Sequence, residues 1–160
     1  MVHMENTGLV LEGGGMRGVF TAGVLDYMMD NGITFPYTIA VSAGACNAVS
    51  YIAGQRGRSK KCDVELLKKY KYIGMRSLLR KRSIMDMDLL FKDFPSTIIP
   101  VDFEAFFKNS NRCVFVVTNC ETGKPEYFEE KSDAQRLNDI CRASSSLPFL
   151  CPITYIEGVP

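Results

Sequence analysis

The sequence contains a single histidine, His3, and this scarcity limits the catalytic chemistry open to the chain. His3 lies in a polar stretch before the first apolar run, so only an improbable fold-back would bring it to a catalytic side chain. A Ser-His-Asp triad needs an imidazole within hydrogen-bond reach of its nucleophile. We therefore exclude such a triad and expect a carboxylate as the base for any serine nucleophile.

Other features are missing too. None of the cysteines forms a C-x-x-C pair or a spacing typical of metal sites. No stretch resembles a signal peptide, and no apolar run approaches the ~20 residues of a membrane-spanning helix. These absences predict a cytoplasmic protein with reduced thiols, several of them buried.

Positive charge is concentrated in one segment. Residues 56–82 contain eleven basic and two acidic side chains, a net charge of +9, whereas the rest of the chain carries −8 and the whole chain +1. Such a segment favours anionic partners, although a solvated Lys-rich helical face has the same composition. Residues 56–82 are therefore a candidate for peripheral membrane contact, as is the apolar-basic run 75–94. We expect no nucleic acid as a partner.

The order of predicted elements indicates an α/β domain. Apolar runs bounded by glycine predict strands, and apolar residues at three- and four-residue spacing predict helices. The expected strands cover residues 8–12, 38–41, 113–118 and 126–129. The expected helices cover residues 17–31, 43–53, 63–82 and 133–143, the last with Ser132 as its N-cap. We expect one domain over residues 1–160, three-layered around a central, mostly parallel sheet.

Ser42 stands between the second strand and its following helix. A nucleophilic serine works well on such a tight turn, where small residues are needed two positions before and after it. Ala40 and Gly44 occupy these positions, so an alanine replaces the usual first glycine. In parallel sheets, sites form beyond the carboxyl ends of the strands, which is where Ser42 falls. Ser42 is therefore a candidate nucleophile.

A glycine-rich cluster, Gly13 to Gly18, lies between the first strand and its helix. It matches the G-x-G-x-x-G pattern of dinucleotide-binding turns, but no acidic residue follows at the end of the second strand to hold a ribose. A phosphate-binding loop would need a Gly-Lys-Ser/Thr sequence, which is absent. Backbone N–H groups at a helix N-terminus also bind an oxyanion, and a purely structural tight turn is the remaining alternative.

Four motifs together resemble the patatin-like phospholipase family, and the similarity extends over residues 8–158. They are Leu9-Val10-Leu11-Glu12-Gly13-Gly14-Gly15-Met16-Arg17-Gly18, Val41-Ser42-Ala43-Gly44-Ala45, Thr118-Asn119-Cys120-Glu121-Thr122-Gly123 and Ala143-Ser144-Ser145-Ser146-Leu147-Pro148. The pairing of the first two is the specific signal. The chain looks most like the small bacterial members.

The resemblance implies a lipid acyl hydrolase with a Ser–Asp dyad and no histidine, which needs no metal ion or organic cofactor. Ser42 would be the nucleophile, and Arg17 would brace the loop. The oxyanion hole would be drawn from residues of the loop and the turn: Gly13, Gly14, Gly15, Met16, Arg17, Gly18 and Ala43. The acyl substrate is left open.

The dyad aspartate of this family sits in an Asp-Gly-Gly or Asp-Gly-Ala motif, and no Asp-Gly pair occurs in this sequence. We therefore expect the chain to be truncated, the aspartate to follow Pro160, and the fragment alone to be inactive. Asp133, Asp139 and Glu157 are weak substitutes. A truncated fold would expose apolar surface and favour self-association.

Two other functions remain open on the sequence. One is a non-catalytic relative that retains the fold as a binding or regulatory module, supported by Ala40 and the missing aspartate. The other is a nucleotide-binding α/β domain built on the glycine cluster.

Overall fold

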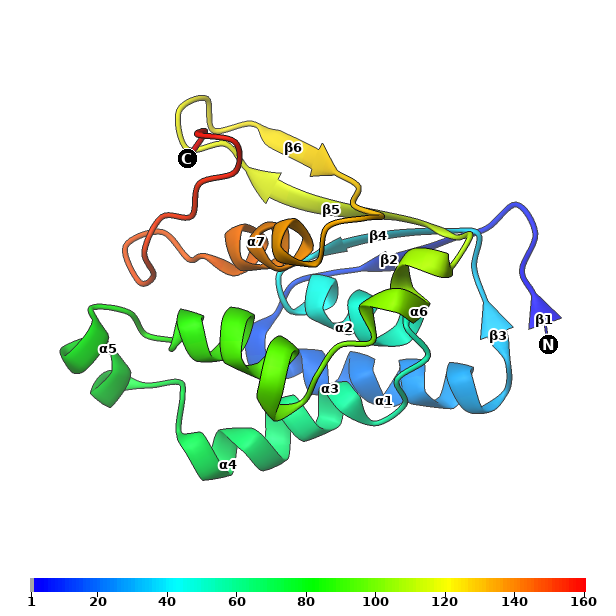
Figure 1. Cartoon of the computed structure of the whole chain (residues 1–160), viewed down its shortest axis with the longest axis horizontal. Coiled ribbons are helices and arrows are strands. Elements are labelled where there is room, and N and C mark those ends of the chain that lie inside the picture. Colours follow the sequence, from blue (N-terminus) through cyan, green and yellow to red (C-terminus); the bar gives the residue numbers. More distant parts are fainter. Residues whose placement is uncertain (1) are drawn as a thin grey trace.

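The computed structural model describes residues 2–160, and a four-stranded sheet is its frame (Figure 1). The strands lie side by side in chain order: β2 (Gly8–Leu11), β4 (Tyr37–Val41), β5 (Arg112–Thr118) and β6 (Pro125–Phe128). β2, β4 and β5 are parallel, and β6 returns antiparallel to β5. The predicted α/β class with a mixed, mostly parallel sheet is confirmed.

The register of the parallel strands brings three chain exits to one edge of the sheet. Leu11 pairs with Ala40, and Ala40 pairs with Phe115. The segments that follow β2, β4 and β5 therefore leave the sheet at neighbouring points. One carries the glycine cluster and the next carries Ser42.

Three helices pack on the sheet, directly or through one another: α1 (Gly18–Asp30), α2 (Ala43–Ile52) and α7 (Ala134–Ser145). α2 packs against β4 and β2, α7 packs against β5, and α1 packs on α2. Ala45 and Ala48 of α2 are completely buried, and their small side chains let the helix approach the sheet closely. Phe115, Leu137 and Ile140 complete the core beside them.

The prediction of one continuous helix over residues 63–82 is wrong, because the structure divides this segment into shorter pieces. The basic segment contains four short pieces: α3 (Arg58–Lys60), the π-helical η2 (Lys61–Leu66), α4 (Leu67–Tyr70) and α5 (Met75–Lys81). The chain breaks after α4, where Lys71 is left-handed at φ 49° and Gly74 has φ 133°. An antiparallel β-bridge between Ile73 and Met85 brings the two ends of the segment around α5 together. This closed segment, residues 73–85, is called the α5 hairpin below. Propensity alone misses this break because tertiary pairing sets it.

Two elements follow α5 in a region that the sequence pattern left unassigned. They are the π-helical η3 (Leu89–Ile98) and α6 (Phe103–Lys108). Phe94 of η3 and Phe106 of α6 are buried, and both are among the largest fully buried side chains. These aromatic side chains anchor the 89–108 region to the core.

Two further expectations require correction. His3 lies on a short strand, β1 (Val2–His3), which pairs in parallel with β3 (Ile33–Thr34), and not in an unpaired tail. The N-cap of α7 is Asp133 rather than Ser132, because the Asp133 carboxylate accepts hydrogen bonds from the N–H groups of Gln135 and Arg136. The Ser132 hydroxyl instead donates to Glu130, at 3.0 Å.

Candidate active site

Ser42 occupies a strained turn between β4 and α2. Its backbone lies at φ 55° and ψ −125°, a conformation that non-glycine residues rarely adopt. Such a conformation costs on the order of 1–3 kcal/mol and persists only where surrounding contacts impose it. Ser42 thus combines backbone strain with a position at the carboxyl edge of the sheet.

A single hydroxyl on α7 holds this turn. The Ser144 Oγ accepts a hydrogen bond from the Ser42 N–H at 2.7 Å and donates one to the Val116 carbonyl at 2.6 Å. This bridge connects the turn, β5 and the last turn of α7 across 102 residues of sequence. Sequence reasoning placed Ser144 in a family motif but assigned it no role, because no local pattern indicates so distant a partner.

The glycine cluster lies directly against the serine turn. A methyl group at Gly13 would stand 3.1 Å from the Cβ of Ser42 and 3.7 Å from its Oγ. A methyl group at Gly44 would stand 2.2 Å from the Leu11 carbonyl oxygen, which leaves no space for any side chain. The side-chain amide of Asn47 donates to the Gly18 carbonyl at 3.0 Å, a third contact between the two segments.

Three backbone N–H groups of the cluster have no hydrogen-bond partner among the described residues. The cluster continues into a short 3₁₀ helix, η1 (Gly15–Arg17), in which the Arg17 N–H donates to Gly14 and the Gly18 N–H donates to Gly15 and Met16. Within residues 2–160, no hydrogen-bond acceptor is found for the N–H groups of Gly14, Gly15 and Met16. Unpaired donors at a helix start suit an anion.

The two halves of the serine turn differ in their tolerance of a side chain. Ala40, 1% exposed, places its methyl group in the core, so alanine satisfies the position that is usually glycine. Only Gly44 faces backbone atoms at a distance that forbids a Cβ. Arg17 is exposed and makes no ion pair within the described chain, so its bracing role stays a prediction.

The three acidic residues considered as substitute bases are engaged elsewhere. Asp133 caps the far end of α7, about 16 Å along the helix from Ser144. Asp139 accepts from the Gln135 side chain, and Glu157 forms an ion pair with Arg136 at 2.8 Å. Ser42 Oγ itself makes no hydrogen bond with a side chain among residues 2–160.

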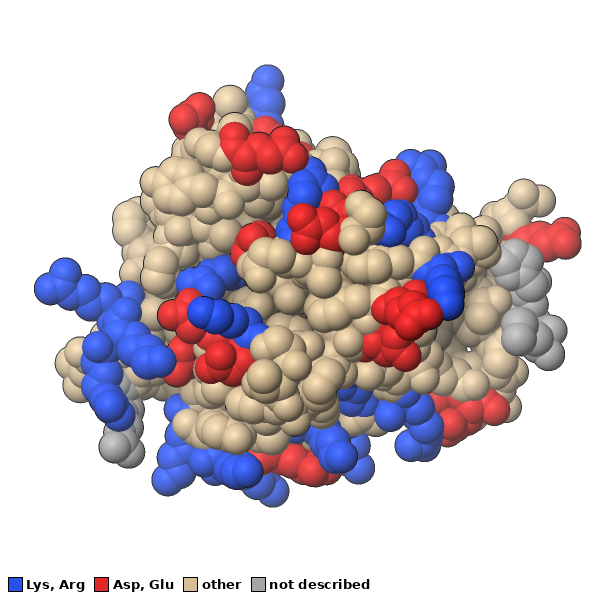
Figure 2. Space-filling model, in the orientation of Figure 1, with Lys and Arg blue, Asp and Glu red and all other residues tan. Residues whose placement is uncertain are grey.

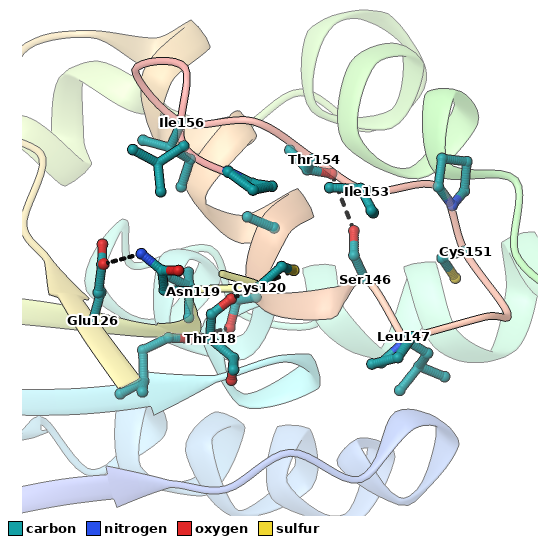
Figure 3. Close-up of a pocket in the computed structure, with 18 of the residues that line it drawn as sticks. Thr118, Asn119, Cys120, Glu126, Ser146, Leu147, Cys151, Ile153, Thr154 and Ile156 are labelled. Atoms are coloured by element: carbon teal, nitrogen blue, oxygen red, sulfur yellow. Dashed lines mark hydrogen bonds between the residues drawn. The ribbon is translucent and has the colours of Figure 1, made fainter. Parts of the chain in front are cut away.

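A cavity of about 560 Å³ opens beside the turn (Figure 3). Its lining includes Val41, which precedes Ser42 in the sequence, and Ser144, which accepts the hydrogen bond from the Ser42 N–H. Most of the remaining lining is apolar and comes from β5, β6 and residues 146–160. Hydrogen bonds fix its polar walls, from the Asn119 amide to Glu126 at 2.6 Å and between the Ser146 and Thr154 hydroxyls at 3.0 Å.

The described residues hold neither a metal-binding cluster nor a membrane-spanning helix. Among the described residues, no group of three His, Cys, Asp or Glu side chains is placed to hold a metal ion. All six cysteines are free; Cys113 and Cys141 are buried, and burial raises the pKa of the Cys113 thiol to about 12. No helix in the described part of the chain is long and apolar enough to cross a bilayer.

The fold and site define an α/β domain with a serine on a strained strand-to-helix turn, packed against a glycine-rich loop. The chain matches the family model described as patatin-like phospholipase over residues 9–160. It is also 33% identical over 156 residues to "Uncharacterized protein YjjU" of Escherichia coli (strain K12). The chain therefore belongs to the patatin-like phospholipase family, as its motifs predicted. That alignment covers 94% of this chain and 43% of YjjU, so the chain spans less than half of this relative's length.

Proposed function

We propose that this chain carries the nucleophile and the oxyanion-binding loop of a lipid acyl hydrolase. The observation that carries the proposal is the contact between Ser42 and Gly13, where a methyl group on the glycine would lie 3.7 Å from the Ser42 Oγ. A carbonyl carbon at the serine hydroxyl would then have its oxygen beside the glycine cluster. Membership of the family supports hydrolysis of lipid acyl esters as the reaction.

The proposed reaction is a two-step acyl transfer. A carboxylate base takes the proton from the Ser42 hydroxyl as Oγ attacks the ester carbonyl, and the N–H groups of Gly14, Gly15 and Met16 stabilise the oxyanion. The tetrahedral intermediate collapses and the leaving alcohol takes the proton. Water, deprotonated by the same base, then releases the acid and restores the serine. Removing one such N–H donor typically lowers the rate by ~10²–10³.

The base of this mechanism is proposed to be the family's aspartate rather than any of the carboxylates described above. Asp133, Asp139 and Glu157 are each bound to other groups, and the chain spans only 43% of the length of YjjU. We accordingly expect residues 1–160 alone to react slowly. A longer protein that includes the aspartate is the form in which turnover is to be measured.

An apolar substrate chain suits the cavity beside Ser42. Its wall includes Val41, Val116, Phe128 and Leu147, and such a surface favours an acyl chain over a polar group. The scissile ester would sit where the cavity approaches the serine turn.

A fluorophosphonate probe tests the proposal, because it reacts covalently with an activated serine. We expect labelling of the aspartate-containing protein at Ser42, loss of labelling in Ser42→Ala, and unchanged labelling in the control Ser96→Ala, whose serine is exposed on η3. Saturable NAD or ATP binding without labelling would instead support a nucleotide-binding domain. Lipid binding without labelling would support a non-catalytic module.

A further inference from the structure

Two exposed apolar segments, far apart in sequence, meet beside the cavity. The hairpin around α5 and the turn at residues 147–151 are joined by a hydrogen bond from the Ile84 N–H to the Leu150 carbonyl at 2.7 Å, and they lie next to each other (Figure 1). Together they present a set of exposed side chains, here named the apolar rim. Its members are Met75 (65% exposed), Leu79 (80%), Leu147 (46%), Phe149 (103%) and Leu150 (39%).

The conformation of Phe149 in the free protein is energetically unfavourable for two separate reasons. Its side chain is completely exposed, and its backbone lies in the left-handed region at φ 65°, where a bulky residue is strained. The turn itself is well fixed, because the N–H groups of Leu150 and Cys151 both donate to the Leu147 carbonyl. The strained backbone therefore presents the Phe149 side chain to solvent.

Positive charge flanks the apolar rim. Figure 2 shows Lys and Arg side chains gathered over the α5 end of the molecule, beside uncharged surface. Arg80 and Arg82 make no ion pair within the described residues, whereas Lys81 is paired with Asp86. The nearby Asp88 is neutralised by Arg142, at 2.7 Å. No unpaired acid on these segments opposes an anionic partner.

From this arrangement we propose that the apolar rim is the surface by which the protein docks on an anionic lipid bilayer. Projecting apolar side chains with unpaired arginines beside them match the interfacial region of a membrane, where rings enter the acyl boundary and guanidinium groups meet phosphates.

The position of the apolar rim connects docking to the cavity. Leu147 and Phe149 belong both to the rim and to the cavity wall. A protein held by these residues would open its cavity toward the bilayer, so an acyl chain would pass from the membrane to Ser42 without crossing water. The proposed membrane contact is thus smaller than the whole segment 56–82, since within that segment it includes only α5. It adds the turn at residues 147–151. Lys60 and Lys61, by contrast, line a separate groove that also holds Asp26 and Asp30.

Vesicle co-sedimentation tests this inference in a Ser42→Ala background, where lipid hydrolysis plays no part. We expect binding to vesicles of phosphatidylcholine with 30 mol% phosphatidylglycerol and weak binding to phosphatidylcholine alone. Each basic residue at such a surface strengthens binding about fivefold, so the double variant Arg80→Gln with Arg82→Gln should bind about 25-fold more weakly. Phe149→Gly, which removes the ring and relieves the strain, should weaken it about tenfold.

Matched controls separate the rim from general charge and general hydrophobicity. Lys60→Gln with Lys61→Gln removes the same charge from the same basic segment and should weaken binding less than threefold. Tyr127→Ser removes an aromatic side chain that is 62% exposed on β6 and should leave binding unchanged. Equal losses in test and control pairs, equal binding to neutral and anionic vesicles, or concentration-dependent self-association in place of binding would overturn the proposal. Because the sedimentation experiment does not measure hydrolysis, its outcome does not test the proposed function. Likewise, a failure of the probe to label Ser42 would contradict the proposed function but not the docking proposal.

Discussion

Replacement of Gly44 by alanine is the most demanding test of how the serine turn is built. Gly44 stands two residues after Ser42, at the start of α2, where β2 and the glycine cluster pass closest to the helix. The added Cβ would meet the Leu11 carbonyl oxygen at 2.2 Å and the Glu12 carbonyl oxygen at 2.7 Å. Both are backbone atoms, so no side-chain rotation relieves the clash.

The expected loss of stability follows from the movement that this clash requires. Separating the Cβ from the Leu11 oxygen by an ordinary contact distance needs a shift of about 1 Å between the end of β2 and the start of α2. Overpacking of this kind costs about 3 kcal/mol, which for a domain of this size lowers the melting temperature by about 6–12 °C. The same shift would carry the glycine cluster away from Ser42.

Thermal and urea unfolding of the chain measure the first consequence, and fluorophosphonate labelling of the aspartate-containing protein measures the second. Gly23→Ala is the matched control, because Gly23 lies within α1 and a methyl group there meets nothing within 4 Å. The control should gain about 0.5–1 kcal/mol from its higher helix propensity. If Gly44→Ala unfolds like the wild type, the close contact between the glycine cluster and α2 is not present in solution, and the proposed oxyanion site loses its structural support.

Three further outcomes are expected. Ser144→Ala removes the acceptor for the Ser42 N–H and the donor to the Val116 carbonyl, so unfolding should become easier by about 1–3 kcal/mol and labelling at Ser42 should slow. The control is Ser96→Ala, because the Ser96 hydroxyl is exposed and donates only to the Lys92 carbonyl of its own helix. Phe149→Gly should stabilise the chain by about 1 kcal/mol in denaturant unfolding, because glycine adopts the left-handed conformation without strain; an unchanged midpoint would contradict this. Burial alone would raise the pKa of Glu130, but hydrogen bonds from the Asp133 N–H, Arg136 and Ser132 lower it from 4.5 to about 2. The ionised carboxylate should therefore contribute about 3 kcal/mol to the free energy of unfolding above pH 4.5, and this contribution should be lost as the pH falls toward 2. Glu130→Gln should flatten that part of the pH–stability curve, and an equally steep curve would count against the assignment.

Local patterns predicted the elements nearest the site. Glycine at fixed positions and short apolar runs located β2, α1, β4 and α2 within one or two residues. The reason is physical, because the close packing of the turn against the cluster requires small residues and leaves a visible mark in the sequence. Gly44, with its 2.2 Å limit, is the clearest example.

Features that depend on distant contacts escaped the sequence. The end of α4 at Lys71 and the separate α5 hairpin depend on the bridge between Ile73 and Met85, not on helix propensity. The Ser144 bridge joins residues 102 positions apart, so no window of sequence reveals it. Ser132 and Asp133 are both good capping residues, and the choice between them follows from the use of the Ser132 hydroxyl by Glu130.

The span of the Ser144 bridge also sets an order for the maturation of the site. A nascent chain that has emerged as far as β5 already contains Ser42, the glycine cluster and the strands between them. Its serine turn, however, has no hydroxyl to receive the Ser42 N–H until residue 144 has been synthesised and α7 has docked. The turn that carries Ser42 thus gains this restraint only after residue 144 has been synthesised, and a shorter polypeptide on the ribosome lacks it.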